Sequence, residues 1–229
     1  MKKRMISLAL TLAMLLSAMP ISGVLAMEDG ATTESILIGE TFNDVVTGGL
    51  PDDVFAVKRA GSGDMSVMAV PDARNKSLYM TTQTDGTTYI EKEIVNPENA
   101  PLTLGFKMMP GNLGSFSLVN IVDDAGNVTP VFEVTDGKIM KDGEELFAFE
   151  TNRWYYMEVA FNITDKAFTL AVDNQKLIKK TGIKYNNFAA LRFQLSATTQ
   201  ELYLDDITMY RADLLTGERK YFEGSRLFL

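Results

Sequence analysis

The chain has 229 residues, 30 Asp and Glu against 22 Lys and Arg, and neither cysteine nor histidine. The lack of cysteine excludes disulfides and a lipid-modified cysteine. The lack of histidine excludes the commonest general base, the usual zinc ligand and every Ser-His or Cys-His nucleophile pair. Carboxylates, Lys, Tyr and metals bound by oxygen remain as sources of chemistry.

The first 26 residues have the order of a secretory signal peptide. A basic start at 2–4 precedes an apolar run over 6–19, and small residues follow at 24–26. This order predicts cleavage after Ala26 and a secreted protein, and the short basic start is typical of bacteria. No second apolar segment approaches the about 20 residues that span a bilayer, so we expect no membrane insertion after cleavage.

Cleavage would leave an acidic chain of 203 residues. The three basic residues of the signal leave with it, so 19 basic residues face 30 acidic ones and the formal charge becomes −11. Such a charge repels phosphate backbones and anionic membranes, which argues against nucleic acid as a partner. Neutral glycans, cations and basic partners remain. The length suits one all-β domain that folds without disulfides.

After a short flexible leader at 27–34, the chain is divided into many short runs. These runs are rich in β-branched and aromatic residues and are separated by Gly, Asn, Asp and Pro, which is typical of strands and turns. We predict strands at 35–42, 54–59, 65–70, 77–82, 87–94, 102–109, 114–122, 130–134, 145–149, 154–163, 166–173, 175–180, 188–197 and 201–210.

Asp-Gly and Asp-Asn pairs mark the sharpest turns, because these residues adopt positive φ at low cost. We expect tight turns at Asp85-Gly86, Asp136-Gly137, Asp142-Gly143 and Asp173-Asn174. A longer acidic segment at 123–127 lacks the terminal Glu and the spacing of an EF-hand loop, so we expect a plain turn there rather than a calcium loop.

Alternation of apolar and polar residues is sharpest in four of the predicted strands, and it places one apolar face on each. These faces hold Leu102, Leu104, Phe106 and Met108; Tyr155, Met157, Val159, Phe161 and Ile163; Phe168, Leu170 and Val172; and Ala189, Leu191, Phe193 and Leu195. Two such sheets packed face to face form an all-β, two-sheet antiparallel β-sandwich, which we predict over 35–210. A charged C-terminal tail at 211–229 follows.

Short motifs along 35–210 resemble one superfamily. They are Glu-Thr-Phe-Asn at 40–43 with Gly-Gly-Leu-Pro at 48–51, Asn-Arg-Trp-Tyr-Tyr-Met-Glu-Val at 152–159 with Phe-Thr-Leu-Ala-Val-Asp at 168–173, and Leu-Tyr-Leu-Asp-Asp-Ile at 202–207. In this order they resemble the concanavalin A-like lectin/glucanase superfamily, which includes laminin-G-like modules and jelly-roll carbohydrate-binding modules. The resemblance implies a jelly roll that binds extracellular glycans or serves as an accessory domain of a polysaccharide-active or surface protein.

The glucanases of this superfamily carry a strand with a Glu-x-Asp-x-Glu or Glu-x-Asp-x-x-Glu string, whose carboxylates act as nucleophile and acid. This chain has no such string. Its nearest segment is Glu91-Lys92-Glu93, where the central Asp and the third acid are missing. We therefore expect a solvated strand face there and no catalytic residues.

The outward faces of the predicted strands carry the candidate ligand-binding residues. Sugars stack their C–H faces on aromatic rings while flanking polar side chains bind the hydroxyls. We expect ligand contacts on a shared open face from Tyr79, Tyr89, Glu91, Trp154, Tyr156, Glu158, Arg192 and Gln194. The alternative for Trp154 is a structural role at the start of its strand, as in laminin-G-like modules.

The resemblance also implies a structural calcium ion between an acidic residue of the first strand and an Asp of the last. Glu40 and Asp205 or Asp206 stand at the matching positions. Asp205 has the strand parity of Ile207 and Met209, so we expect it to point inward, where a buried carboxylate needs a partner or a metal. The alternative is that these carboxylates accept backbone amides at a strand end.

The sequence thus predicts a secreted, non-catalytic module that binds a polysaccharide or cell-surface glycan. One alternative is a diverged glycoside hydrolase or polysaccharide lyase that uses carboxylates or Tyr. Another is a structural domain that mediates protein contacts at the cell wall. No cofactor is expected apart from the calcium ion.

Overall fold

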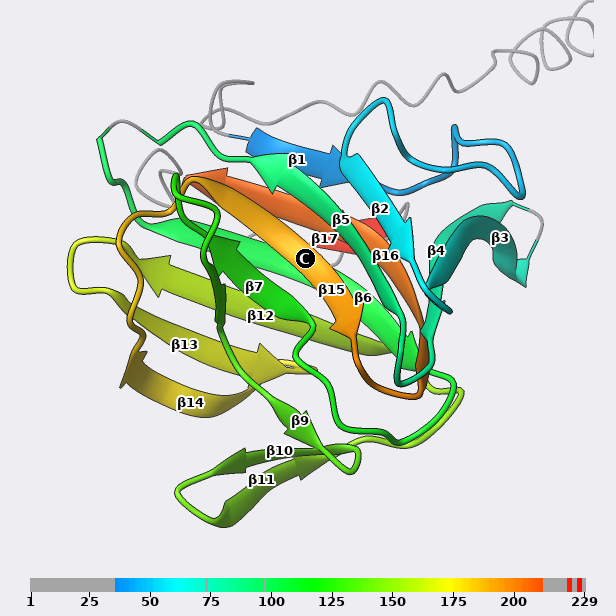
Figure 1. The fold of residues 1–229 in the computed structure, drawn as a ribbon. Coiled ribbons are helices and arrows are strands. Elements are labelled where there is room, and N and C mark those ends of the chain that lie inside the picture. The colour runs from blue at the N-terminus through cyan, green and yellow to red at the C-terminus, as the bar shows by residue number, and fades with distance from the viewer. Residues whose placement is uncertain (1–35, 73, 97, 212–221, 224–225, 228–229) are drawn as a thin grey trace, which may run out of the picture.

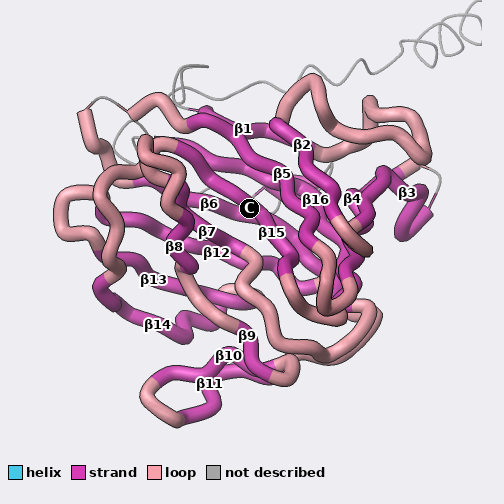
Figure 2. Tube along the Cα trace, viewed as in Figure 1, coloured by secondary structure: helices cyan, strands magenta, loops and turns pink. Residues whose placement is uncertain are grey.

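The computed structural model describes residues 36–72, 74–96 and 98–211, together with the backbone of two short strands, β17 (Phe222–Glu223) and β18 (Arg226–Leu227). These residues form strands, turns and loops, and Figure 2 shows no helical segment among them. Accordingly, this part of the chain holds no helix long and apolar enough to cross a membrane. The expected signal peptide and leader, and most of the C-terminal tail, lie outside the described residues.

The larger sheet has the order β14-β13-β12-β6-β16-β4-β3, and β1 also pairs with β16 (Figure 1). Its strands are β1 (Ile36–Glu40), β3 (Asp64–Asp72), β4 (Asn75–Thr82), β6 (Leu102–Pro110), β12 (Tyr155–Asn162), β13 (Ala167–Val172), β14 (Gln175–Gly182) and β16 (Gln200–Arg211). One side of the long strand β16 pairs first with β4 and then with β1, and its other side pairs with β6.

The smaller sheet has the order β2-β5-β15-β7-β8 and lies across the larger one (Figure 1). Its strands are β2 (Ala56–Ala60), β5 (Thr87–Glu93), β7 (Val119–Val122), β8 (Val128–Pro130) and β15 (Ala190–Ser196). A separate three-stranded meander contains β9 (Val134–Thr135), β10 (Lys138–Lys141) and β11 (Glu144–Ala148). The two main sheets are antiparallel and form the predicted sandwich, which confirms the fold class.

The core lies between the two main sheets. Met157, Phe161 and Leu170 of the larger sheet and Phe193 of the smaller sheet are each at most 2% exposed. Phe106 and Phe193 meet edge to face across the layers, with ring centroids 5.1 Å apart. The apolar faces predicted from alternation are therefore the faces that pack together.

Three of the four predicted tight turns join neighbouring strands as expected. Asp136-Gly137 joins β9 to β10, Asp142-Gly143 joins β10 to β11, and Asp173-Asn174 joins β13 to β14. Both residues of each pair have positive φ, the geometry that matches the twist of a two-residue hairpin. These turns set the register of the strands beside them.

The chain turns at Asp85-Gly86, where the Gly86 N–H donates to the Gln83 carbonyl, but this turn does not form a hairpin. The chain passes there from β4 in the larger sheet to β5 in the smaller sheet, so the two strands do not pair. A Cβ on Gly86 would lie 2.6 Å from the Gly63 nitrogen, so the close approach of two loops requires glycine. Local turn chemistry cannot distinguish a hairpin from a passage between layers.

The region around the meander also differs from the prediction. The run expected at 130–134 is divided between β8, which ends at Pro130, and β9, which begins at Val134. The run expected at 114–122 keeps only β7, with an isolated bridge between Phe116 and Val134. Strand β10 was not predicted, because its four residues lie between two turn pairs and show little alternation.

The contact between Phe106 and Phe193 gives a test of the sandwich. Phe193→Ala should lower the free energy of unfolding by about 3–5 kcal/mol, because it removes a ring from a close-packed core. Phe193→Leu should cost clearly less, since it keeps most of the volume. Urea denaturation followed by circular dichroism measures both changes, and a loss below about 1 kcal/mol for the alanine variant would place Phe193 outside the core.

Candidate functional site

The structure divides the predicted ligand-binding residues between the two outer faces of the sandwich. The smaller sheet carries Tyr89, Glu91, Arg192 and Gln194, and the larger sheet carries Tyr79, Trp154, Tyr156 and Glu158. Trp154 lies immediately before β12. Because each sheet buries its inner face against the other, the two groups point away from each other. The expectation of one shared face is therefore wrong.

On the smaller sheet, the four predicted residues bind one another. Arg192 Nε and Nη2 each lie 2.6 Å from Glu91 Oε2, and Nη1 lies 3.3 Å from Gln194 Oε1. The guanidinium also stacks on the Tyr89 ring, 4.1 Å from its centroid. Glu91 and Arg192 are direct cross-strand partners, which explains the ion pair. A ligand on this face would have to compete with these contacts.

On the larger sheet, Tyr79 belongs to a cluster with two residues of β16. Its hydroxyl donates to Glu201 Oε2 at 2.9 Å, and its ring lies 5.0 Å from the Tyr203 ring. Partial burial, followed by the hydrogen bond to the Glu201 carboxylate, raises the pKa of Tyr79 above its usual value. Tyr79 is thus a neutral donor that is already engaged.

A β-bulge in β16 shapes the centre of the outer face. Asp206 has φ of 49°, and the pairing between β16 and β6 shifts from Asp205 opposite Lys107 to Thr208 opposite Gly105. The bulge lies between the part of β16 that pairs with β4 and the part that pairs with β1. The bulge therefore lies at the point where β1 takes over from β4 as the pairing partner of β16.

The bulge reverses the expected orientation of Asp205. An extra residue in a strand changes the face on which the following side chains lie. Ile207 and Met209 lie in the core, whereas Asp205 lies opposite Lys107 and lines a pocket on the outer face. The prediction that Asp205 shares the inner face is wrong, although Asp205 is only 1% exposed.

The two carboxylates at the bulge share one cation. Lys107 Nζ lies 2.8 Å from Asp206 Oδ2. Asp205 instead accepts hydrogen bonds from the Asn75 side-chain amide at 3.1 Å and from the Asp206 backbone N–H at 2.8 Å. Burial, followed by the charge of Asp206, raises the pKa of Asp205 from 3.8 to about 7. In the part of the chain that the structure describes, Asp205 is thus a carboxyl without an ion pair of its own.

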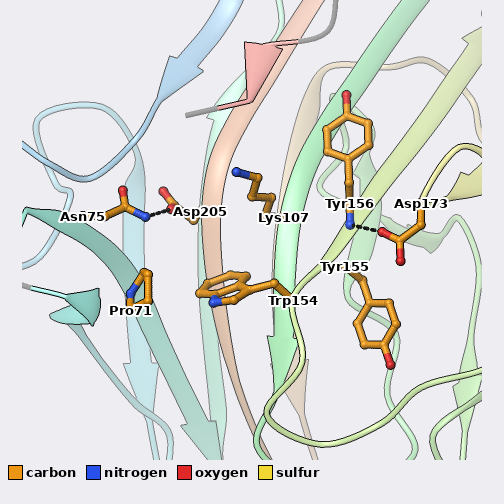
Figure 3. Close-up of a pocket in the computed structure, with 8 residues that line it drawn as sticks. All are labelled: Pro71, Asn75, Lys107, Trp154, Tyr155, Tyr156, Asp173 and Asp205. Carbon is orange, nitrogen blue, oxygen red and sulfur yellow. Dashed lines mark hydrogen bonds between the residues drawn. The ribbon is translucent and has the colours of Figure 1, made fainter. Parts of the chain in front are cut away.

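These groups form the floor of a pocket of about 310 Å³ on the outer face of the larger sheet (Figure 3). Pro71 and Trp154 are apolar groups that line it, and its polar lining groups include Asn75, Lys107, Asp173 and Asp205. The Tyr155 side chain points away from the opening in Figure 3 and packs against Phe147 and Phe149. The pocket thus combines an indole with convergent hydrogen-bonding groups.

Tyr156 also lines this pocket, with its ring against the sheet. A Cβ on Gly105 would lie 2.4 Å from the Tyr156 hydroxyl oxygen, so the glycine leaves the space that the ring occupies. The Tyr156 backbone N–H donates to Asp173 Oδ1 at 2.9 Å, and its carbonyl accepts the Asp173 N–H at 2.8 Å. These two bonds tie the start of β12 to the β13–β14 turn and hold the rim of the pocket.

The geometry does not assemble a calcium site from the predicted residues. Glu40 Oε1 accepts the backbone N–H of Phe42, and Lys107 already neutralises Asp206. Across the described residues, no group of three or more acidic side chains is placed to hold a metal ion. The calcium ion therefore stays a prediction without support from this arrangement.

The acidic turn at 123–127 uses its carboxylate internally. Asp123 Oδ1 accepts the backbone N–H groups of Ala125 and Asn127, and Oδ2 accepts the side-chain amides of Asn127 and Asn186. These bonds, chiefly that from the Asn127 side chain, lower the pKa of Asp123. The geometry is that of the expected plain turn.

Sequence reasoning missed several residues of the pocket, namely Pro71, Asn75, Lys107 and Asp173. Lys107 occupies the polar position of a strand whose other face is apolar, so alternation could have found it. Pro71 and Asn75 lie near the β3–β4 turn and reach the pocket only because β4 pairs with β16. No local signal shows that contact.

No protein-family model matches this sequence, and no curated protein matches it. Solved structures match the fold. One is a sialidase, with a TM-score of 0.61 and 13% identity over 80% of this chain. This chain spans only 19% of the length of that sialidase.

Two further structures are similar over most of this chain. Domain 4 of AbnA, a GH43 extracellular arabinanase from Geobacillus stearothermophilus in complex with arabinotriose, has a TM-score of 0.52 and 9% identity, covering 80% of this chain and 98% of that domain. The binding domain of botulinum neurotoxin DC, in complex with rat synaptotagmin II, has a TM-score of 0.50 and 11% identity, covering 78% of this chain and 48% of that one. At such identities the likeness shows the fold alone, a two-sheet antiparallel β-sandwich.

The raised pKa of Asp205 predicts how stability depends on pH. The folded state binds the Asp205 proton more tightly than the unfolded state does. The stabilisation that this proton gives the folded state is therefore complete below about pH 4 and is lost as the pH rises to about 7. Asp205→Asn should keep the neutral shape and raise the free energy of unfolding at pH 8 by about 2–4 kcal/mol. Urea titrations at pH 5 and pH 8 measure the change. A larger gain at pH 5 than at pH 8 would contradict it.

Proposed function

We propose that this protein is a secreted, non-catalytic module that binds carbohydrate, and that the pocket on the outer face of the larger sheet is its binding site. The observation that carries the proposal is the meeting of Trp154 and Pro71 with Asn75, Lys107 and Asp205 in one depression. Ligand sites combine apolar walls with a few convergent polar groups, and sugars suit an aromatic wall beside such groups.

The mechanism is stacking in a preformed site. A sugar ring would place its C–H face on the Trp154 indole, with Pro71 as the second apolar group. Its hydroxyls would exchange hydrogen bonds with the Asn75 amide, the Lys107 ammonium and the Asp205 carboxyl. The volume of about 310 Å³ lies at the small end of ligand pockets and suits a short stretch of sugar.

The likeness to domain 4 of the arabinanase supports this proposal, because that domain matches over 98% of its length and its structure contains arabinotriose. A polysaccharide or cell-surface glycan is therefore the proposed partner. Of the residues predicted from sequence, Trp154 and Tyr156 belong to the proposed site, with Glu158 two residues further along β12. The ligand role of Tyr79 and of the four residues on the smaller sheet stays a prediction.

A second candidate is a module that binds protein. The neurotoxin domain of similar fold forms a complex with synaptotagmin II, which supports protein binding as the second candidate. The enzymatic alternative has less support, because Glu91, the carboxylate nearest to the glucanase string, is engaged by Arg192 at 2.6 Å. Glycan binding at the pocket separates the first proposal from both alternatives.

Removing the indole should strongly weaken carbohydrate binding. Trp154→Ala should weaken affinity by about tenfold or more, because a stacking platform in a binding site is an energetic hot spot. Trp154→Phe should weaken it less. Wild type is first screened on a glycan array of arabinans, xylans, galactans and glucans, and isothermal titration calorimetry on the best ligand then measures the variants.

Gln194→Ala is the matched control, because it truncates a partly buried polar side chain on the opposite face. We expect it to bind as wild type does, with both variants checked for folding by circular dichroism. Full binding by Trp154→Ala, or loss of binding in Gln194→Ala alone, would move the site to the smaller sheet. Failure of wild type to bind any array glycan would refute the carbohydrate function.

We also propose that the protein acts outside the cytoplasm after removal of residues 1–26. Expression of the full chain in a bacterial host with a Sec pathway should yield a secreted form whose amino terminus is Met27, since the small-residue pattern ends at Ala26. Intact-mass measurement of the secreted and cytoplasmic fractions checks this. A secreted form that retains residue 1, or an entirely cytoplasmic product, would contradict it.

A further inference from the structure

The charges around the pocket do not balance. Among the residues that the structure describes, the charged groups that line it are one cation, Lys107, and two carboxylates, Asp173 and Asp205. Lys107 is already paired with a third carboxylate, Asp206, at 2.8 Å. Negative charge therefore exceeds positive charge at the floor of the pocket.

The rim does not correct this imbalance. Arg153 Nη2 lies 3.6 Å from Asp173 Oδ2, and Arg153 Nη1 lies 3.6 Å from Glu150 Oε1. This guanidinium therefore also lies between two carboxylates. Its side chain is 53% exposed, so solvent screens it more than the groups at the floor.

Lys107 is poorly placed to attract an anion. Its side chain is 23% exposed and that of Asp206 is 9% exposed, so the pair is partly shielded from water. An anionic ligand would have to share the ammonium with Asp206 and would lie close to Asp205. Repulsion between like charges is strongest where the surroundings are poor in water, as at this floor.

We propose that the pocket selects uncharged sugars and discriminates against acidic ones, such as uronic acids and sialic acids, with Asp205 as the residue that determines this specificity. The inference rests on the proposed carbohydrate function and narrows its ligand class. Asp205 is almost fully buried, so it acts through the field it creates at the pocket as much as through direct contact. Burial, followed by the charge of Asp206, raises the pKa of Asp205 to about 7, so its full negative charge is present only at about pH 9 and above, and each measurement of the field is made at about pH 9.

On the outer face of the smaller sheet, by contrast, a positive and a negative side chain balance each other. Arg192 and Glu91 form a two-bond ion pair there, and each neutralises the other. Within 36–72, 74–96 and 98–211, no such partner pairs with Asp205, whose hydrogen bonds there come from an amide side chain and a backbone N–H. The imbalance is thus a property of the pocket and not of every charged cluster on the surface.

The field can be measured without any sugar, because Trp154 is the only tryptophan in the chain and lines the pocket. Its fluorescence is quenched in turn by caesium, iodide and neutral acrylamide, with N-acetyltryptophanamide as the free reference. We expect caesium to be favoured over iodide by about twofold or more relative to the reference, because a negative field concentrates cations. Equal quenching, or a preference for iodide, would overturn the proposal.

Two variants that each remove one negative charge at about pH 9, where Asp205 is ionised, locate the source of the field. Asp205→Asn should reduce the preference for caesium, while Glu93→Gln, which removes an exposed carboxylate from β5 in the smaller sheet, should leave it unchanged. Equal effects of both variants would mean that the net charge of the protein, and not Asp205, sets the preference. That result would overturn the assignment to Asp205.

Selectivity itself is tested with pairs of polymers that differ only in charge. Polygalacturonate and glucuronoxylan are each compared with their own carboxyl-reduced forms by affinity electrophoresis, together with the array ligands. For any pair that binds, the reduced form should bind about tenfold or more tightly than its acidic parent, and Asp205→Asn should narrow the gap. An acidic parent that binds as tightly as its reduced form would overturn the inference while leaving the carbohydrate function standing. If no glycan binds, the function fails and the selectivity fails with it.

Discussion

Phe106 and Phe193 meet edge to face between the two sheets, and the burial of these inner faces determines where every other side chain lies. Once alternate residues of a strand are committed to the core, the remaining residues must point outward. Because Phe193 points into the core, its neighbours Arg192 and Gln194 point to one outer surface. Because Met157 points into the core, its neighbour Tyr156 points to the other. The outward-pointing polar and aromatic residues therefore lie on two surfaces on opposite sides of the sandwich.

The two surfaces use their charges differently. On the smaller sheet, the Glu91 carboxylate and the Arg192 guanidinium neutralise each other, and the Tyr89 ring covers the cation. On the larger sheet, Lys107 serves two adjacent carboxylates, and Asp205 keeps a strongly raised pKa. An unbalanced, partly shielded carboxyl costs stability, and such groups concentrate at functional sites. This contrast adds to the reasons for proposing the site on the larger sheet.

The bulge at Asp206 connects the topology to the site. Strand β16 must pair with β4 along one part and with β1 along the next, and the extra residue lies at the junction. The same residue turns Asp205 toward Lys107, where Asn75 of β4 can reach it. A feature that allows one strand to serve two neighbours thus also builds the pocket floor.

Alternation and turn chemistry were enough to predict the antiparallel sandwich, the residues of its core, and the tight turns at Asp136-Gly137, Asp142-Gly143 and Asp173-Asn174, because these depend on neighbours within a few positions. They also selected Trp154 and Tyr156. Only the tertiary structure decided which candidates share a face, since that depends on strand order: Tyr89 and Tyr156 have similar local patterns but lie in different sheets. The orientation of Asp205 was decided there as well. A single inserted residue changes which side chains face the core. The position of that residue depends on the pairing of β16 with strands more than 90 residues earlier in the chain.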